Sequence, residues 1–200
     1  MPRSLLLLGT FYGGMVTIGG VLGTKQVAIG PLSVEAGIFS FLTLVALSSA
    51  VAELHGRAVA DRLVRYGFAP LAASILLSLF VLALPTDPGM YEPAKAAFPI
   101  VMSQGWRMMA AGIISYGISV RLNVWLFSRF SGVAGVRGAM AAACSQIVDT
   151  LIFITVSFVG VRPILPLMIG QATAKVVLSA VIVPGIIWLA CRIGRWVDQG

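Results

Sequence analysis

Polar and charged residues recur at helical spacing within two strongly apolar stretches in the last third of the chain. Gln146 and Asp149 lie three residues apart, with Ser145 beside them, so the two side chains share one face of a helix. Gln171 and Lys175 lie four residues apart in the next stretch and share a face in the same way. Together they supply a carboxylate, an ammonium and two amides, which can donate and accept hydrogen bonds to a small polar molecule.

The acid and the amine are expected to meet. An ionisable side chain at the centre of a bilayer costs at least about 2.5–3.5 kcal/mol, so it usually persists only where it is paired or functional. Asp149 and Lys175 each lie 13 residues from Arg162, at the turn between the two stretches. If the stretches form an antiparallel hairpin, the two charges lie at the same depth. The sequence therefore predicts an ion pair, which either stabilises the helices or forms part of a solute site.

Other residues in the apolar stretches are candidates for the same site. Arg107 and Arg121 are further cations inside or at the ends of these stretches. Aromatic rings can provide flat faces for a ligand, although each also fits a lipid-facing or interfacial position. These rings are Trp106, Tyr116, Trp125 and Phe153. Trp106 and Arg107 together form an entrance or an anchor at the headgroups.

The composition shows which elements must position these groups. The 200 residues are 58% hydrophobic and only 10% charged, with a mean hydropathy of +0.98, whereas soluble domains carry about 25% charged residues. A helix crosses the hydrocarbon core with about 20 apolar residues. We therefore predict an all-α, polytopic membrane protein, a single domain over residues 1–200. Its six predicted transmembrane helices are Leu5–Leu22, Ala36–Ala52, Phe68–Leu84, Gly105–Phe127, Ala139–Val159 and Leu165–Ala190.

The distribution of arginine and lysine predicts the orientation. With the N-terminus inside, eight basic residues lie on the cytoplasmic side and three on the outer side, which favours cytoplasmic N- and C-termini. The eight are Arg3, Arg57, Arg62, Arg65, Arg129, Arg137, Arg192 and Arg195, and the three are Lys25, Lys95 and Arg162.

Several classes of protein are disfavoured by what the chain lacks. Its net charge of +7 is explained by topology, so no nucleic-acid partner is expected. One histidine, His55, and two cysteines without ligand spacing predict no metal site, no disulfide framework and no cofactor. The same shortage removes Ser-His and His-metal constellations, so we expect no enzyme. The apolar run from Leu5 to Leu22 favours a first transmembrane helix over a signal peptide.

Two further patterns concern packing and the membrane surface. The first span carries Gly9 and Gly13, and again Gly19 and Gly23, each pair on one helix face. Such faces allow close helix packing, and the alternative is a path for a flat solute. Residues 57–65 alternate basic and apolar side chains, which fits a short helix on the cytoplasmic surface or a solvated loop, with Asp61 and Arg65 at pairing distance.

Three stretches together resemble the family of queuosine-precursor transporters, also called the vitamin uptake transporter family. The first runs from VLGTKQVAIGP to LVRYGF, and the second contains SQIVDTLIF, a Ser-Gln-x-x-Asp helix carried by Ser145, Gln146 and Asp149. The third is QATAKVVLSAV, in which Lys175 fits a Lys-Val helix. In the first stretch the matching residues are Lys25, Glu53, Gly56, Arg62 and Gly67.

The resemblance implies a six-helix importer in the cell (inner) membrane whose cargo is 7-cyano- or 7-aminomethyl-7-deazaguanine. Asp149 would accept the ring N–H and exocyclic amine of such a base, and Gln146 and Lys175 would serve its carbonyl. The chain departs from the family pattern at Gly20, Ser49 and Asn123, so another purine-like or vitamin-like cargo stays open. The expected substrate-binding residues are Ser145, Gln146, Asp149, Gln171, Lys175, Arg107, Asn123 and Tyr116.

Two alternatives remain at this point. The chain fits the substrate-binding membrane subunit of a larger energised vitamin importer, because it contains no Walker motif and no soluble nucleotide domain. It also fits a non-catalytic membrane assembly protein, since its glycine faces permit close helix association. The expected partners are a deazapurine-like small molecule, the lipid bilayer, and either a second copy of the chain or an energising protein.

Overall fold

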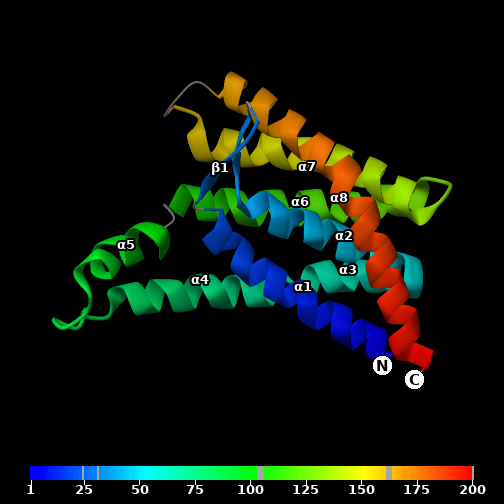
Figure 1. Ribbon diagram of the computed structural model, residues 1–200, viewed down its shortest axis with the longest axis horizontal. Helices are drawn as coiled ribbons and strands as arrows, with labels where there is room; N and C mark the ends of the chain where they lie inside the picture. Colours follow the sequence, from blue (N-terminus) through cyan, green and yellow to red (C-terminus); the bar gives the residue numbers. More distant parts are fainter. Residues whose placement is uncertain (24, 31, 103–105, 161–163, 200) are drawn as a thin grey trace.

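The computed structural model describes residues 1–23, 25–30, 32–102, 106–160 and 164–199. Within these residues the chain forms helices packed side by side and one small antiparallel sheet (Figure 1). The helices are α1 (Arg3–Leu22), α2 (Gly37–His55), α3 (Arg57–Tyr66), α4 (Phe68–Ala83), α5 (Glu92–Met102), α6 (Trp106–Arg129), α7 (Ala134–Phe158) and α8 (Leu165–Gln199). The strands are β1 (Gln26–Ile29) and β2 (Leu32–Glu35).

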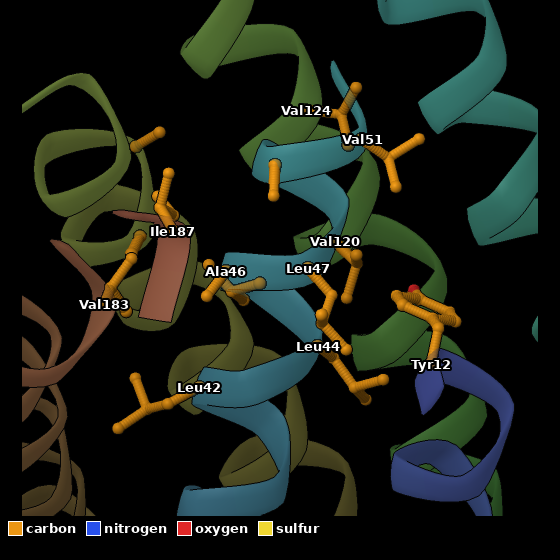
Figure 2. Packing of buried hydrophobic residues seen from close by; sticks show 14 of the residues in the cluster. Tyr12, Leu42, Leu44, Ala46, Leu47, Val51, Val120, Val124, Val183 and Ile187 are labelled. Carbon is orange, nitrogen blue, oxygen red and sulfur yellow. The ribbon is translucent and has the colours of Figure 1, made fainter. Parts of the chain in front are cut away.

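Helix α2 forms the centre of the bundle and packs against α1, α3, α6, α7 and α8. Its residues from Leu44 to Val51 are all buried, and small side chains such as Ala46 and Ala50 let neighbouring helices approach closely. Figure 2 shows this core, with α2 between α6 on one side and α8 on the other. The labelled residues there are Leu42, Leu44, Ala46, Leu47 and Val51 of α2, Val120 and Val124 of α6, Val183 and Ile187 of α8, and Tyr12 of α1.

The helices confirm a multi-helix membrane protein. Five segments of the described chain are long and apolar enough to cross a bilayer: Arg3–Leu22, Gly37–His55, Arg57–Ala83, Ala134–Phe158 and Met168–Gln199. The predicted fourth span corresponds to α6, which has 24 residues and is not among these five. Because α6 has Arg121 and Asn123 within it, its apolar character is weaker. The count of six spans therefore stays a prediction.

Two segments differ from the sequence expectations. β1 and β2, which were not predicted, form a hairpin in which Gln26 pairs with Glu35 and Ile29 with Leu32. The segment between the third and fourth predicted spans was expected as a polar gap, but it contains α5. Residues 98–102 belong to that separate helix and do not extend the fourth span. Gly105 lies outside the described residues.

The short helix α3 does not lie apart on the surface. Gly67 keeps helical backbone angles, so α3 runs almost directly into α4, and Val64 of α3 is buried. A short helix is confirmed here and a loop is wrong; Ala60 and Val64 tie this helix to the bundle, and its place on the cytoplasmic membrane surface stays a prediction. The ion pair on α3 joins Arg57 to Asp61 at 3.5 Å rather than Asp61 to Arg65.

Both chain termini lie at one end of the bundle (Figure 1). The Ser4 amide donates to Asp198 Oδ1 at 2.9 Å, and Ser4 Oγ lies 2.9 Å from His55 Nε2. Arg137 near the start of α7 pairs with Glu53 near the end of α2 at the same end. The helix segments that carry the eight basic residues predicted to be cytoplasmic therefore lie at one end of the bundle (Figure 1). The cytoplasmic location of that end stays a prediction. We call this the terminal end, and we call the opposite end, where the β1–β2 hairpin lies, the hairpin end.

Candidate functional site

The predicted contact between the last two helices is present. Lys175 Nζ lies 2.9 Å from Asp149 Oδ2, with side chains only 12% and 7% exposed. α7 and α8 pack against each other and run antiparallel (Figure 1), and the contact between the two side chains places Asp149 and Lys175 at one depth. The hypothesis of an Asp149–Lys175 ion pair, made from spacing about Arg162, is confirmed; Arg162 itself lies outside the described residues.

Ser119 of α6 is a third member of this group and was not predicted. Its Oγ lies 3.1 Å from Asp149 Oδ1 and 2.5 Å from the Ser115 carbonyl oxygen. A hydroxyl has one proton, so Ser119 donates to only one of these acceptors at a time. The spacing of Ser115 and Ser119, four apart on one face of an apolar helix, is the signal that would have found it.

The ion pair lies on the wall of a cavity of about 240 Å³. The cavity is lined by residues of α1, α2, α4, α5, α6, α7 and α8 and of β2, and it lies in the half of the bundle nearer the hairpin end. Four of the residues singled out from the sequence for their charge or ring contribute to its lining: Asp149, Lys175, Tyr116 and Phe153. A charged pair beside aromatic rings in a largely apolar hollow is the usual character of a small-molecule site.

Further polar residues line the cavity that sequence reasoning missed. Ser40 donates to the Met15 carbonyl at 2.5 Å, and Ser74 donates to the Leu71 carbonyl at 2.8 Å. Glu35, at the end of β2, places a second carboxylate on the lining. Serines in apolar helices look alike in the sequence, whether they face a cavity or another helix, so only the packing distinguishes them.

A tyrosine junction closes the cavity toward the terminal end. Tyr116 Oη lies 2.8 Å from Tyr12 Oη, and the Tyr116 ring meets Phe68 edge-on with ring centroids 5.1 Å apart. Gly67 makes room for this contact, since a Cβ there would lie 2.2 Å from Tyr116 Oη. The predicted role of Tyr116 as a flat face fits its ring, while its hydroxyl holds α6 against α1.

The Gly19–Gly23 pair at the end of α1 confirms the close-packing role, and its suggested role as a path for a flat solute stays a prediction. Gly37 of α2 is so close to α1 that a Cβ on it would lie 3.1 Å from the Gly19 carbonyl oxygen and from Gly23 Cα. Gly19, Gly20 and Gly23 also line the cavity. Glycines here thus allow two helix backbones to touch and leave open space beside them.

The two predicted amides lie beside the ion pair but not on the cavity lining. Gln146 is fully buried, and neither its Oε1 nor its Nε2 has a hydrogen-bond partner among the described residues. Gln171 is 2% exposed, and its Nε2 likewise lacks a partner in the described chain. Ser145 is buried and donates to the Ala142 carbonyl at 3.0 Å, within its own helix.

Asn123 and the remaining candidates lie elsewhere. Asn123 Nδ2 donates to Ser49 Oγ at 3.0 Å, to Ser48 Oγ at 3.2 Å and to the Val45 carbonyl, so it ties α6 to α2 below the cavity. Trp125 is exposed, with the Arg129 guanidinium over its ring, and it is not among the residues that line the cavity, so its suggested role as a ligand face stays a prediction. Arg107 and Trp106 are in the first turn of α6, with side chains outside the described part of the structure.

Two of the three departures from the family pattern touch each other. Ser49 and Asn123, at two positions where the family that the chain resembles usually carries acids, form a neutral hydrogen-bonded pair between α2 and α6. A pair of neighbouring neutral groups avoids the cost of two buried like charges. The third departure, Gly20, lies on the cavity itself.

The comparison with protein families agrees with this architecture. A model for the family described as "Putative vitamin uptake transporter" matches residues 35–189, which include Asp149, Lys175 and the helices from α2 through most of α8. No curated protein and no solved structure was found to match the chain. The match covers more than three quarters of the sequence. The chain therefore belongs to the vitamin uptake transporter family.

Proposed function

We propose that this protein imports a small, flat, polar solute, of which a queuosine precursor, 7-cyano- or 7-aminomethyl-7-deazaguanine, is the leading candidate, with a related purine-like or vitamin-like molecule as the wider class. The observation that carries the proposal is the Asp149–Lys175 pair on the wall of the 240 Å³ cavity. A buried charge pair costs desolvation free energy that a purely structural contact seldom recovers. Because this pair lies on the wall of a cavity, its charges can contact a bound solute, which would explain why the desolvation cost is tolerated.

The chemistry of the lining suits a guanine-like edge. The ring N–H and exocyclic amine of a deazaguanine present two parallel donors, which a carboxylate such as Asp149 accepts as a pair. Lys175 can then turn from the carboxylate to the cargo carbonyl. The rings of Phe153 and Tyr116 offer flat apolar faces to the base. Binding in this scheme exchanges the ion pair for contacts with the cargo.

The two glutamines without hydrogen-bond partners in the described chain support a second conformation in which α7 and α8 lie slightly farther apart. A buried polar group without a partner costs about 1–3 kcal/mol, and Gln146 and Gln171 flank the ion pair on α7 and α8. A small separation of these helices would let both amides reach cargo or water. In the proposal, Gln146 and Gln171 contact the solute after this movement, and Ser145 supports the α7 backbone beside them.

The position of the cavity suits uptake into the cell. It lies toward the hairpin end, and the Tyr12–Tyr116 junction separates it from the terminal end. With the termini in the cytoplasm of a cell whose inner membrane holds the protein, the cavity faces the outside. Transport then requires the junction to part while the outer side closes, as in alternating access about a central site.

The test is uptake of labelled 7-cyano-7-deazaguanine and its aminomethyl form by cells that lack their own carrier. Asp149→Ala should lower uptake by about 10- to 100-fold, because a paired, charge-assisted contact is worth about 1.5–3 kcal/mol. The control is Asp61→Asn, which changes a partly exposed acid on α3 away from the cavity and should transport normally. Equal uptake by Asp149→Ala and the parent protein would remove Asp149 from the site, and no uptake by the parent would reject these two cargoes.

A further inference from the structure

A second hollow lies at the terminal end, far from the cavity. This groove, of about 490 Å³, runs between the start of α7 and the last three turns of α8. We call it the α7–α8 groove. Its lining residues are Val133, Ala134, Gly135, Ile187, Trp188, Cys191, Arg192, Arg195, Trp196 and Gln199.

The groove is basic and its charge is not neutralised within the protein. Arg192 and Arg195 are exposed, and neither pairs with a carboxylate in the described residues. The lining contains no acidic residue among those the structure describes. Arg192 stacks its guanidinium over the Trp188 ring, 5.3 Å from the centroid, which directs it along the groove. Two exposed arginines about one turn apart on α8 therefore line the groove without a salt bridge to a carboxylate of the described chain.

The first turn of α7 adds donors to the same groove. Val133 occupies the N-cap of α7, and no side chain caps this end of the helix. The amides of Ala134 and Gly135 begin the helix beside the two arginines. A helix N-terminus carries about half a positive charge and free N–H groups, both of which favour phosphate oxygens.

If the Asp149–Lys175 pair is taken as the midplane of the bilayer, the length of α8 carries the groove to the depth of the phospholipid headgroups. α8 has 35 residues, or about 52 Å, far more than a hydrocarbon core of about 30 Å requires. Trp188 lies about 20 Å along α8 from Lys175, beyond the roughly 15 Å of half a core. Trp188, Trp196 and Val133 are 61%, 75% and 75% exposed. Tryptophans so placed are typical of the membrane interface.

From these features we propose that the α7–α8 groove binds the headgroup of an anionic phospholipid. The lipid phosphate lies between Arg192, Arg195 and the α7 N-terminus, and its acyl chains lie along the exposed face of α8 below Trp188. Arginine binds a phosphate through paired N–H donors. In a zwitterionic headgroup the choline cation opposes this attraction, whereas an anionic headgroup has no such cation, so the two arginines should prefer the anionic lipid. The inference concerns a surface separate from the cavity and does not depend on the identity of the cargo.

The test is native mass spectrometry of the full-length protein titrated with phosphatidylglycerol or with phosphatidylcholine of equal chain length. Phosphatidylglycerol should bind at least about tenfold more tightly. Arg192→Gln/Arg195→Gln should weaken its binding by about fivefold for each arginine, the equivalent of about 1 kcal/mol each. Arg62→Gln/Arg65→Gln removes the same charge from exposed positions of α3 and should leave the preference intact.

Two outcomes would overturn the proposal, and a third variant separates loss of recognition from misfolding. Equal weakening by both double variants would show attraction by net charge rather than a site. Displacement of the lipid by millimolar inorganic phosphate, with the same dependence on Arg192 and Arg195, would identify a site for a free anion. Arg192→Lys/Arg195→Lys retains the charge without the paired donors, so its weaker but measurable lipid binding would show that the double glutamine variant fails through recognition and not through misfolding.

Discussion

Two ion pairs hold helix α7 in the bundle, and they differ in their surroundings. Asp149–Lys175 joins α7 to α8 beside the cavity, with side chains 7% and 12% exposed. Glu53–Arg137 joins α2 to α7 at the terminal end, with side chains 30% and 21% exposed, and the Arg137 guanidinium also covers the Phe127 ring at 4.3 Å. Both contacts tie helices together. In the described part of the chain, Asp149 and Lys175 line the cavity, whereas Glu53 and Arg137 do not.

The comparison shows that a charge pair is not by itself evidence of a site. Water at the terminal end can solvate Glu53 and Arg137 when they separate, so their pairing contributes little and their separation costs little. Asp149 and Lys175 have no such alternative unless a solute provides it. Proximity to a cavity therefore distinguishes a pair that can exchange partners with cargo from a pair that anchors a helix.

The largest expected effect separates the structural and functional roles of the buried pair. Asp149→Leu should lower the free energy of unfolding by about 3–5 kcal/mol, because it leaves the Lys175 ammonium buried and unpaired. Asp149→Leu/Lys175→Leu should recover most of that loss. Unfolding by denaturant in detergent measures both. If the double variant regains stability but not uptake, the pair serves transport; if it regains both, the pair is structural only.

The next effect concerns the junction that divides the two regions. Gly67→Ala would place a Cβ 2.2 Å from Tyr116 Oη and 2.8 Å from Tyr12 Cε1, and overpacking of this kind costs about 1–3 kcal/mol. Gly138→Ala is the matched control, because its close neighbour is the mobile end of the Ile187 side chain. The midpoint temperature of thermal unfolding should fall clearly for Gly67→Ala and less for Gly138→Ala. The reverse order would contradict the rigidity of the tyrosine junction.

A smaller effect is expected at the Glu53–Arg137 ion pair of the terminal end. Glu53→Gln should lower the free energy of unfolding by about 1 kcal/mol or less, as for other partly exposed pairs, and should leave uptake of the solute unchanged. The measurement is the same unfolding titration with a parallel uptake assay, and its effect should shrink in high salt. A loss of uptake as large as that of Asp149→Ala would erase the distinction between the two pairs.

The smallest effect tests the third member of the buried group. Ser119→Ala removes a hydroxyl shared between Asp149 and the Ser115 carbonyl, so the free energy of unfolding should fall by about 0.5–1.5 kcal/mol. Ser128→Ala is the control, since Ser128 donates only to the Val124 carbonyl of its own helix. If Ser119 orients the carboxylate for cargo, its variant should show weaker binding of the deazaguanine, whereas the control should not.

The sequence alone determined the membrane-embedded helices and the charge pair. Apolar length fixes a span because unpaired backbone groups cannot enter lipid, and the cost of a buried charge predicts that Asp149 has a partner. Equal spacing from the turn then identified Lys175. The hairpin of β1 and β2 and the helix α5 were missed, because segments too short to cross the bilayer are not subject to this length constraint.

Tertiary structure alone decided which polar groups share the cavity. Ser40, Ser115 and Glu35 line it, while Asn123 and Ser49 bind each other outside it. Helical periodicity places a side chain on a face of its own helix but does not say which helix covers that face. The cavity exists because seven helices leave space between them near Gly19 and Gly20, and such a gap depends on all the contacts of the bundle at once.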